Sequence, residues 1–258
     1  MRILLSSVAA AALFTSGAYA ADVYEPMAGG LKDAPVYVPV NTWTGFYIGA
    51  NGGYGWNADK KDLVFTSPVT GFRGVSRGLE PEGGFGGGQA GYNWQRGTIV
   101  FGIETDIQGS DIRDSYNNVV VPSNSGPLGV SAKESVDFFG TVRGRIGYAM
   151  DRTLIYATGG FAYGEVNSRF DLTNGAATAR LTRDRTDTGF AVGGGLEYAL
   201  NPAWSFKVEY QYIDLGSEKA TGTSSNGVFL TTNEIDTNFH TVRVGINYHI
   251  HDDYVPLK

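Results

Sequence analysis

Between residues 44 and 250 the chain alternates apolar residues with polar or small residues, with a period of two. Successive side chains of a β-strand point to opposite faces, so this period predicts strands that each have one apolar face. Eight segments follow it: 44–56, 85–95, 98–112, 135–150, 153–166, 188–200, 204–213 and 238–250. Strands in globular sheets are usually about 5–6 residues long, whereas about 9–11 residues cross a bilayer at a tilt. The segments have the greater length, which is typical of membrane strands.

The connections between these segments fall into two length classes. Three are tight turns (95–97, 151–152 and 201–203), and four are long and polar (57–84, 114–134, 167–187 and 214–237). Outer-membrane barrels place short turns at the periplasmic rim and long loops outside the cell. We therefore predict an all-β fold over residues 42–250. It is an eight-stranded antiparallel transmembrane up-and-down β-barrel with short periplasmic turns and four long extracellular loops.

The two faces of the predicted strands differ in charge. One face carries essentially none, whereas the other carries both acids and bases. An Arg or Lys that faces the hydrocarbon at mid-depth costs about 2–4 kcal/mol, but a barrel interior tolerates charges that are paired. We expect a lumen charge network formed by Glu104, Asp106, Asp137, Arg143, Arg145, Glu197, Lys207, Glu209 and Arg243.

Alternation alone also fits a soluble, lipocalin-like barrel with its apolar face inside. The aromatic residues separate the two interpretations, because they gather on the apolar face near both ends of the segments. Two such belts are typical of a barrel that meets lipid at two interfaces. The predicted girdles are Tyr92, Trp94, Tyr148, Tyr198, Trp204 and Tyr248 near the tight turns, and Tyr54, Trp56, Phe138, Tyr163 and Tyr212 near the long connections.

Composition narrows the function classes. The formal net charge is −6 and the pI is about 5.1, which is the wrong sign for a nucleic-acid partner. The chain has no cysteine, which excludes disulfides, thiol catalysis and cysteine-bound metals. Its 37 glycines amount to about twice the usual share. Small residues allow a narrow barrel to curve and close.

The first twenty residues have the organisation of a signal peptide. Arg2 precedes an apolar stretch over residues 3–14, and Ala18-Tyr19-Ala20 fits the small-x-small cleavage pattern. We expect cleavage between Ala20 and Ala21, so that the mature protein is exported. Residues 21–41 are rich in Pro and Gly and are interpreted as a periplasmic tether. Residues 251–258 are interpreted as a short C-terminal periplasmic tail.

No motif in the chain predicts catalysis. Gly86, Gly88 and Gly91 match a dinucleotide fingerprint, but that motif must open a helix, and here it lies inside a predicted strand. His249 and His251 have a spacing that suits one metal ion, yet no third ligand is nearby in the sequence. We therefore expect no enzyme activity, no cofactor and no metal site.

Several stretches resemble a known family. Residues 43–56, read as WTGFYIGANGGYGW, together with residues 83–92, 154–164 and the last strand, resemble the alphaproteobacterial outer-membrane immunogenic proteins (RopB-like), within the OmpA/OmpX-like eight-stranded β-barrel superfamily. The resemblance covers about residues 42–250. It implies an abundant surface antigen that stabilises the envelope, and it supplies no catalytic residue.

The last strand is also similar to the signal that the outer-membrane assembly machinery reads. The matching positions are Arg243, Gly245, Tyr248 and Ile250, although Ile250 replaces the usual terminal Phe. The resemblance therefore implies that the assembly machinery is one partner. The others that we expect are outer-membrane lipid and lipopolysaccharide, and an unidentified extracellular partner of the loops.

The hypothesis that these features favour is a non-enzymatic integral protein of the bacterial outer membrane. It anchors and stabilises the envelope and displays its loops for antigenicity, adhesion or host interaction. One alternative is a small porin-like transporter, although eight strands leave an interior just wide enough for side chains. Another is a surface receptor for a ligand such as haem, which would use the loop aromatics Phe65, Phe72, Tyr116 and Phe229.

Overall fold

The computed structural model describes residues 42–59, 62–175 and 177–250. The predicted signal peptide, its cleavage site at Ala20 and Ala21, the tether and the C-terminal tail lie outside these ranges. Within them the regular structure consists of β-strands. No helix of the described chain is long and apolar enough to cross a membrane. The all-β class is therefore confirmed.

Twelve strands are present in the described residues, not the eight expected. The long strands are β1 (Gly45–Asn57), β4 (Glu82–Arg96), β5 (Ile99–Ser123), β6 (Gly126–Met150), β7 (Thr153–Thr173), β8 (Thr178–Ala199), β9 (Trp204–Glu218) and β12 (Ile235–Ile250). The short strands are β2 (Leu63–Thr66), β3 (Arg73–Ser76), β10 (Thr221–Ser224) and β11 (Phe229–Thr232). All four short strands lie in connections that the sequence analysis took for loops.

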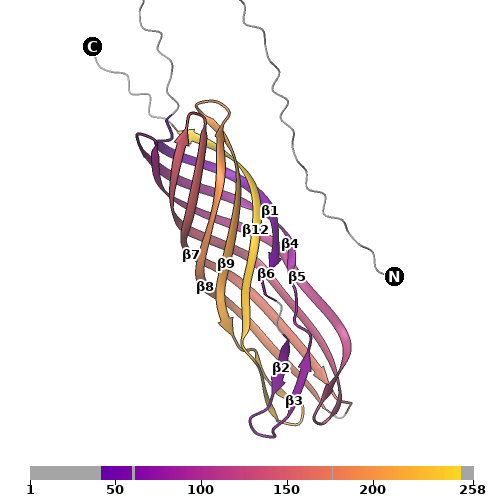
Figure 1. Cartoon of the computed structure of the whole chain (residues 1–258). Coiled ribbons are helices and arrows are strands. Elements are labelled where there is room, and N and C mark those ends of the chain that lie inside the picture. Colours follow the sequence, from indigo (N-terminus) through magenta and orange to yellow (C-terminus); the bar gives the residue numbers. More distant parts are fainter. Residues whose placement is uncertain (1–41, 60–61, 176, 251–258) are drawn as a thin grey trace, which may run out of the picture. The chain divides into compact units, whose positions relative to one another are not determined.

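The eight long strands pair antiparallel in a closed cycle, which we call the proximal ring. Its order is β1-β4-β5-β6-β7-β8-β9-β12, and β12 returns to β1 in a register that runs from Phe46↔Ile250 to Asn57↔Phe239. Figure 1 shows these strands running between the turns at one end and β2 and β3 at the other. Because the cycle closes, no long strand is left with an unpaired edge along its shared length.

The short strands complete a second cycle, which we call the distal ring. Strands β5 to β8 continue past the proximal ring, and the remaining wall is formed by β10, β11, β2 and β3. Strand β8 pairs with β10, β11 pairs with β2, and β3 reaches β5 at Gly74↔Ser123. Each long connection therefore contains strands of the sheet, and the prediction that they are loops throughout is wrong.

The pattern missed these extensions for two reasons: the inward side chains change from polar to apolar, and some strands also change phase at a bulge. Strand β5 is irregular between Gly109 and Ile112 and again between Tyr116 and Val119, where Asn118 has a positive φ of 48°. A β-bulge adds one residue and so exchanges the inner and outer faces for the residues that follow. In β5 the buried positions stay even from Val100 to Tyr116 and are odd at Val121, so only the second irregularity exchanges the faces.

The two rings have opposite polarity. The proximal ring exposes apolar side chains on its outside, for example Phe46 at 62%, Ile107 at 56% and Leu196 at 52%, and buries charges inside. The distal ring buries an apolar cluster that includes Phe65, Val130, Phe170, Leu181 and Leu230. Apolar burial in water is favourable, so the distal ring has the polarity of a water-soluble barrel.

Four layers follow one another inside the barrel, and strand β5 passes through all of them. Val100 belongs to an apolar cluster near the tight turns, and Glu104 and Asp106 lie in the charged layer. Ile112 belongs to a second apolar cluster, which includes Phe85, Phe139 and Phe239. Tyr116 begins the distal core. The charged layer is therefore enclosed by apolar layers on both sides.

Closure of the distal ring depends on Gly222 in β10, because a Cβ there would collide with the Arg180 carbonyl oxygen of β8. We expect Gly222→Ala to separate these strands and to accelerate amide exchange in β10 by about tenfold or more, equivalent to about 1.4 kcal/mol. Exchange in β1 should not change. Gly86→Ala is the control, since its added Cβ has its nearest neighbour at 3.6 Å. Equal effects of the two changes would contradict a closed distal ring.

Candidate functional site

Eight of the nine predicted lumen charges lie inside the proximal ring. Each of them is at most 5% exposed, and Glu197 and Lys207 are fully buried. The buried set comprises Glu104, Asp106, Arg143, Arg145, Glu197, Lys207, Glu209 and Arg243. Four are acids and four are bases, so their formal charges cancel.

Asp137 is the exception, and its assignment to the lumen is wrong. The register of β6 against β7 shifts between Val136 and Phe138. This irregularity allows Val136 and Phe139 both to be buried, and it leaves Asp137 exposed. There Asp137 accepts a hydrogen bond of 2.8 Å from Asn167 Nδ2. The correct face could not be read from the alternation, because the bulge reverses it.

Strand register sets opposite charges beside each other. Glu104 of β5 is the direct partner of Arg143 of β6, and Glu209 of β9 is the partner of Arg243 of β12. Directly opposed residues have Cβ atoms about 4.5–5.5 Å apart. The register therefore places an acid directly beside a base at these two positions of the proximal ring.

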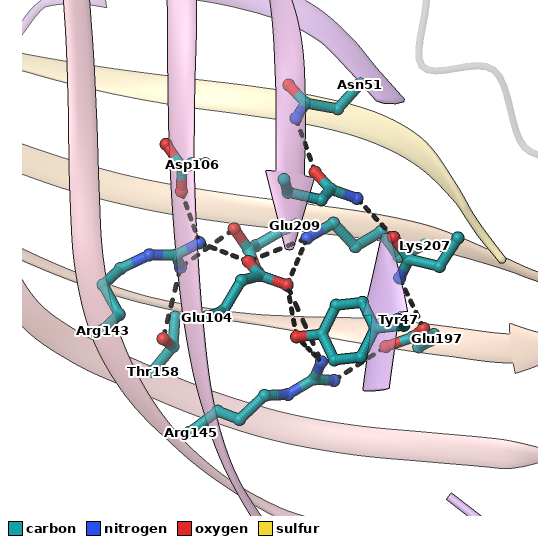
Figure 2. Close-up of polar contacts among 12 residues, drawn as sticks. Tyr47, Asn51, Glu104, Asp106, Arg143, Arg145, Thr158, Glu197, Lys207 and Glu209 are labelled. Carbon is teal, nitrogen blue, oxygen red and sulfur yellow. Dashed lines mark hydrogen bonds and ion pairs between the residues drawn. The ribbon is translucent and has the colours of Figure 1, made fainter. Parts of the chain in front are cut away.

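Arg143 is the centre of the network (Figure 2). Its Nη2 lies 2.6 Å from Glu104 Oε1 and 3.0 Å from Asp106 Oδ2, and its Nη1 lies 3.1 Å from Glu209 Oε1. Its Nε donates to Thr141 Oγ1 at 2.7 Å. One guanidinium thus joins three carboxylates from two strands, and its planar set of donors suits this arrangement.

Other contacts cross the lumen between strands that are not neighbours. Lys207 of β9 reaches Glu104 of β5, with Nζ 2.9 Å from Oε2, although Glu197 is its register partner on β8. Arg145 of β6 reaches Glu197 of β8 at 2.8 Å. These ion pairs span the lumen between separate parts of its wall.

Uncharged side chains complete the network, and the sequence analysis did not identify them. Tyr47 Oη donates to Glu104 Oε2 at 2.8 Å, and Tyr156 Oη donates to Glu209 Oε2 at 2.6 Å. The Arg145 guanidinium lies 4.0 Å from the centre of the Tyr156 ring. The position of Tyr47 in the alternation could have identified it, because Tyr47 lies on the face of small and polar residues in its segment. Its aromatic character gave no indication of a lumen position.

Trp43 closes the lumen at the end of the tight turns. It is 1% exposed, although it precedes β1, and its backbone N–H donates to Gln95 Oε1 at 2.8 Å. Its ring packs edge-on against His249 at 5.7 Å. His249 Nε2 is 2.8 Å from Ser205 Oγ, while His251 lies outside the described residues. In the described ranges no group of three or more His, Cys, Asp or Glu residues is arranged to hold a metal ion.

The predicted girdle residues all lie on the outer face of the proximal ring, half-buried or exposed. Those near the tight turns include Trp94 at 53% and Tyr148 at 48% exposure, and those at the other end include Tyr54 at 47%. On β12, Arg243 points into the lumen, whereas Tyr248 and Ile250 are exposed on the outside. The assembly role of Arg243, Gly245, Tyr248 and Ile250 stays a prediction.

The loop aromatics expected to bind a ligand are mostly in the distal core. Phe65 is fully buried and Tyr116 is 6% exposed, while Phe229 is 43% exposed. Tyr116 Oη is 2.8 Å from Ser76 Oγ, so its hydroxyl is also engaged. Phe65 and Tyr116 are part of the distal core, so two of the four aromatic residues that the receptor hypothesis requires are not accessible to a ligand.

Glu134 lies where the two rings meet, between Val136 of the second apolar cluster and Ala132 of the distal core. It is 5% exposed, and burial raises the pKa of its carboxyl to about 7, against the opposing charge of Arg183. Arg183 itself forms an ion pair with Asp187 and donates to Thr237 Oγ1 at 3.5 Å. Unlike the lumen carboxylates, Glu134 is thus better accommodated in its neutral form.

Comparison with known proteins identifies relatives over nearly the whole chain. The family described as outer membrane protein beta-barrel domain matches residues 6–249. The 31 kDa outer-membrane immunogenic protein of Brucella melitensis is 41% identical over 257 residues, which cover 95% of this chain and 98% of that protein. The 25 kDa outer-membrane immunogenic protein of Brucella abortus is 30% identical, with 96% and 99% covered. The 22 kDa outer membrane protein of Rhizobium leguminosarum bv. viciae is 32% identical, with 72% and 71% covered.

Removal of the central guanidinium tests the network. Arg143→Ala leaves four buried acids against three buried bases, so one buried charge is uncompensated and we expect a loss of about 3–5 kcal/mol in the free energy of unfolding from lipid vesicles. Adding Glu104→Ala should recover part of this loss, because residues in contact do not act additively. The control is Arg113→Ala, whose side chain is 60% exposed in its ion pair with Asp111 and should cost about 0–1 kcal/mol. Simple additivity of the two lumen changes would show that they are not paired.

The elevated pKa of Glu134 predicts a pH dependence with a definite sign. The folded state binds this proton more tightly than the unfolded state, so its stabilising effect is complete below about pH 4.5 and is lost as the pH rises through about 7. Glu134→Gln should therefore stabilise the protein at pH 8, by at most about 3 kcal/mol, and change little at pH 5. The readout is urea unfolding at both pH values, with exposed Glu234→Gln as control. An equal effect of Glu134→Gln at both pH values would contradict the assignment.

Proposed function

The chain belongs to the outer membrane protein β-barrel domain family, and on this basis we propose that it is a non-enzymatic barrel that stabilises the envelope and displays its distal ring at the cell surface. It is an integral outer-membrane protein, in agreement with the matched family and with the relatives named as outer-membrane proteins. The observation that carries the proposal is the reversal of polarity between the two rings.

The reversal supports an orientation in the membrane. An apolar outside with aromatic belts at both ends suits the proximal ring to the hydrocarbon and its two interfaces. An apolar inside suits the distal ring to water. The tight turn after Met150, together with the other tight turns, then faces the periplasm, and the distal ring with β2, β3, β10 and β11 extends outside the cell.

The enclosed charge network supports an anchoring role over transport. Four ion-paired bases fill the lumen, Trp43 covers it on one side, and the Phe85, Phe139 and Phe239 layer covers it on the other. Ions cross a bilayer readily only through a hydrated path. The porin alternative requires such a path, and it would appear as large, long-lived open channels in planar-bilayer recordings.

The proposed partners follow from this orientation. The belts contact lipid and lipopolysaccharide, and the last strand, with Gly245, Tyr248 and Ile250 on β12, offers the assembly signal. The distal ring is the surface available to extracellular partners and to antibodies. Relatives named immunogenic support the antigen role.

The anchoring role is tested in a strain that lacks the gene. We expect several-fold higher sensitivity to sodium dodecyl sulfate, restored by the wild-type gene and by Arg113→Ala. Arg143→Ala should restore less, because fewer barrels reach the folded state. Sensitivity that does not change on deletion would contradict an envelope-stabilising role. Channel recordings of the purified protein separate this outcome from the porin alternative.

Cysteine labelling tests the orientation, because the chain has no native cysteine that would also react. Ser125→Cys and Asn226→Cys lie at exposed tips of the distal ring, and Arg152→Cys lies in a tight turn. A membrane-impermeant maleimide added to intact cells should label the first two and spare the third. All three should react after the cells are permeabilised. The reverse pattern in intact cells would mean that the barrel is inverted.

A further inference from the structure

A cavity of about 200 Å³ lies at the outer end of the distal ring. It is bounded by the tips of the β2–β3, β5–β6, β7–β8 and β10–β11 connections, and by Phe72, Leu128, Leu172 and Leu230 on its inner side. Leu128, Leu172 and Leu230 are 3%, 4% and 7% exposed and belong to the distal core cluster. The floor of the cavity is therefore part of a packed core.

The chemistry of the lining changes from floor to rim. Apolar side chains form the floor, and Ser, Thr and Asn side chains such as Ser125, Thr178 and Asn226 form the rim. Among the described residues that line the cavity, none is charged. A charged ligand would lose hydration here without gaining an opposite charge. The lining is therefore complementary to an uncharged molecule with one polar end.

The walls of the cavity are held in place by hydrogen bonds. The Ala177 N–H donates to Asn174 Oδ1 at 2.8 Å in the β7–β8 turn, and the Val228 N–H donates to Ser224 Oγ at 3.1 Å before β11. Ser225 donates its backbone N–H to the Thr178 carbonyl at 2.7 Å, which ties the two connections together. A preformed cavity loses less entropy when a ligand binds than one that must first be ordered.

The volume sets the ligand size. An apolar cavity of about 150 Å³ in a protein core stays dry and binds benzene. The tip cavity is somewhat larger and has a polar rim. It fits a six-membered ring with one short polar substituent, or an aliphatic chain of similar volume.

We propose that the tip cavity of the distal ring is a binding site for small uncharged amphiphiles, with an apolar body of about six to eight carbons and one hydroxyl or amide group. The apolar body lies against Phe72, Leu128, Leu172 and Leu230, and the polar group lies among the Ser, Thr and Asn side chains of the rim. In the surface orientation argued above, the site opens to the surroundings of the cell. The site itself depends only on the distal ring.

The test uses the full mature protein in lipid nanodiscs and 4-fluorobenzyl alcohol as the probe, followed by fluorine NMR. We expect saturable binding above the level of protein-free nanodiscs. Ala177→Trp and Val228→Trp each place an indole at the cavity and should weaken binding at least tenfold. Val120→Trp places the same group on the exposed outside of the distal ring, where Val120 is 67% exposed, and should bind within twofold of wild type.

A charged analogue tests the predicted ligand class. At pH 7.4, 4-fluorobenzoate should bind at least tenfold more weakly than the alcohol. The proposal is overturned by non-saturable binding to wild type, by wild-type affinity in a folded cavity-filling variant, or by equal binding of the benzoate. Circular dichroism establishes folding, and the two filling variants are independent, so one suffices if the other does not fold. Because binding is measured with the purified protein, its result does not depend on whether deletion of the gene changes the detergent sensitivity of cells.

Discussion

Each strand of the proximal ring hydrogen-bonds to a neighbour on both sides, and the rest of the structure depends on this closure. Hydrocarbon offers no other partner for backbone N–H and C=O groups, so a sheet that crosses it must close on itself. A closed sheet sends alternate side chains outward and inward. Once the outward positions are apolar, the polar and charged side chains share a narrow lumen. There they must pair, and the contacts of Arg143 with Glu104, Asp106 and Glu209 satisfy that requirement.

The same strands meet the opposite requirement a few residues later. Strands β5 to β8 run through both rings, and their inward side chains change from Glu104 and Arg143 to Val130 and Phe170. The surrounding solvent explains the change. In the membrane, lipid covers the apolar side chains, whereas in water only the interior can remove them from solvent. The change requires no phase shift in β7, where Tyr156 and Phe170 share one face, or in β8, where Glu197 and Leu181 do. Near the junction β6 exchanges its faces between Val136 and Phe139.

The two rings thereby support two parts of one proposed role. The proximal ring is closed by ion pairs between apolar layers, which favours a stable anchor over a channel. The distal ring has its own core and hydrogen-bonded closure, so it presents a defined surface and not a set of independent loops. Glu134 lies between the two environments. Its raised pKa reflects a position that is buried like the lumen acids but lacks their close set of cations.

The sequence by itself determined the all-β class, the long paired strands, the outer aromatic belts and eight of the nine lumen charges, because a period of two is a local property of each strand. It did not determine which charges meet. Lys207 pairs with Glu104 across the lumen and not with its neighbour Glu197, and only the curvature of the closed ring brings these side chains together. Asp137 and the distal ring were misassigned for a related reason. A bulge or a short strand such as β10 is specified by its partners in the folded sheet, and those contacts join residues far apart in the chain.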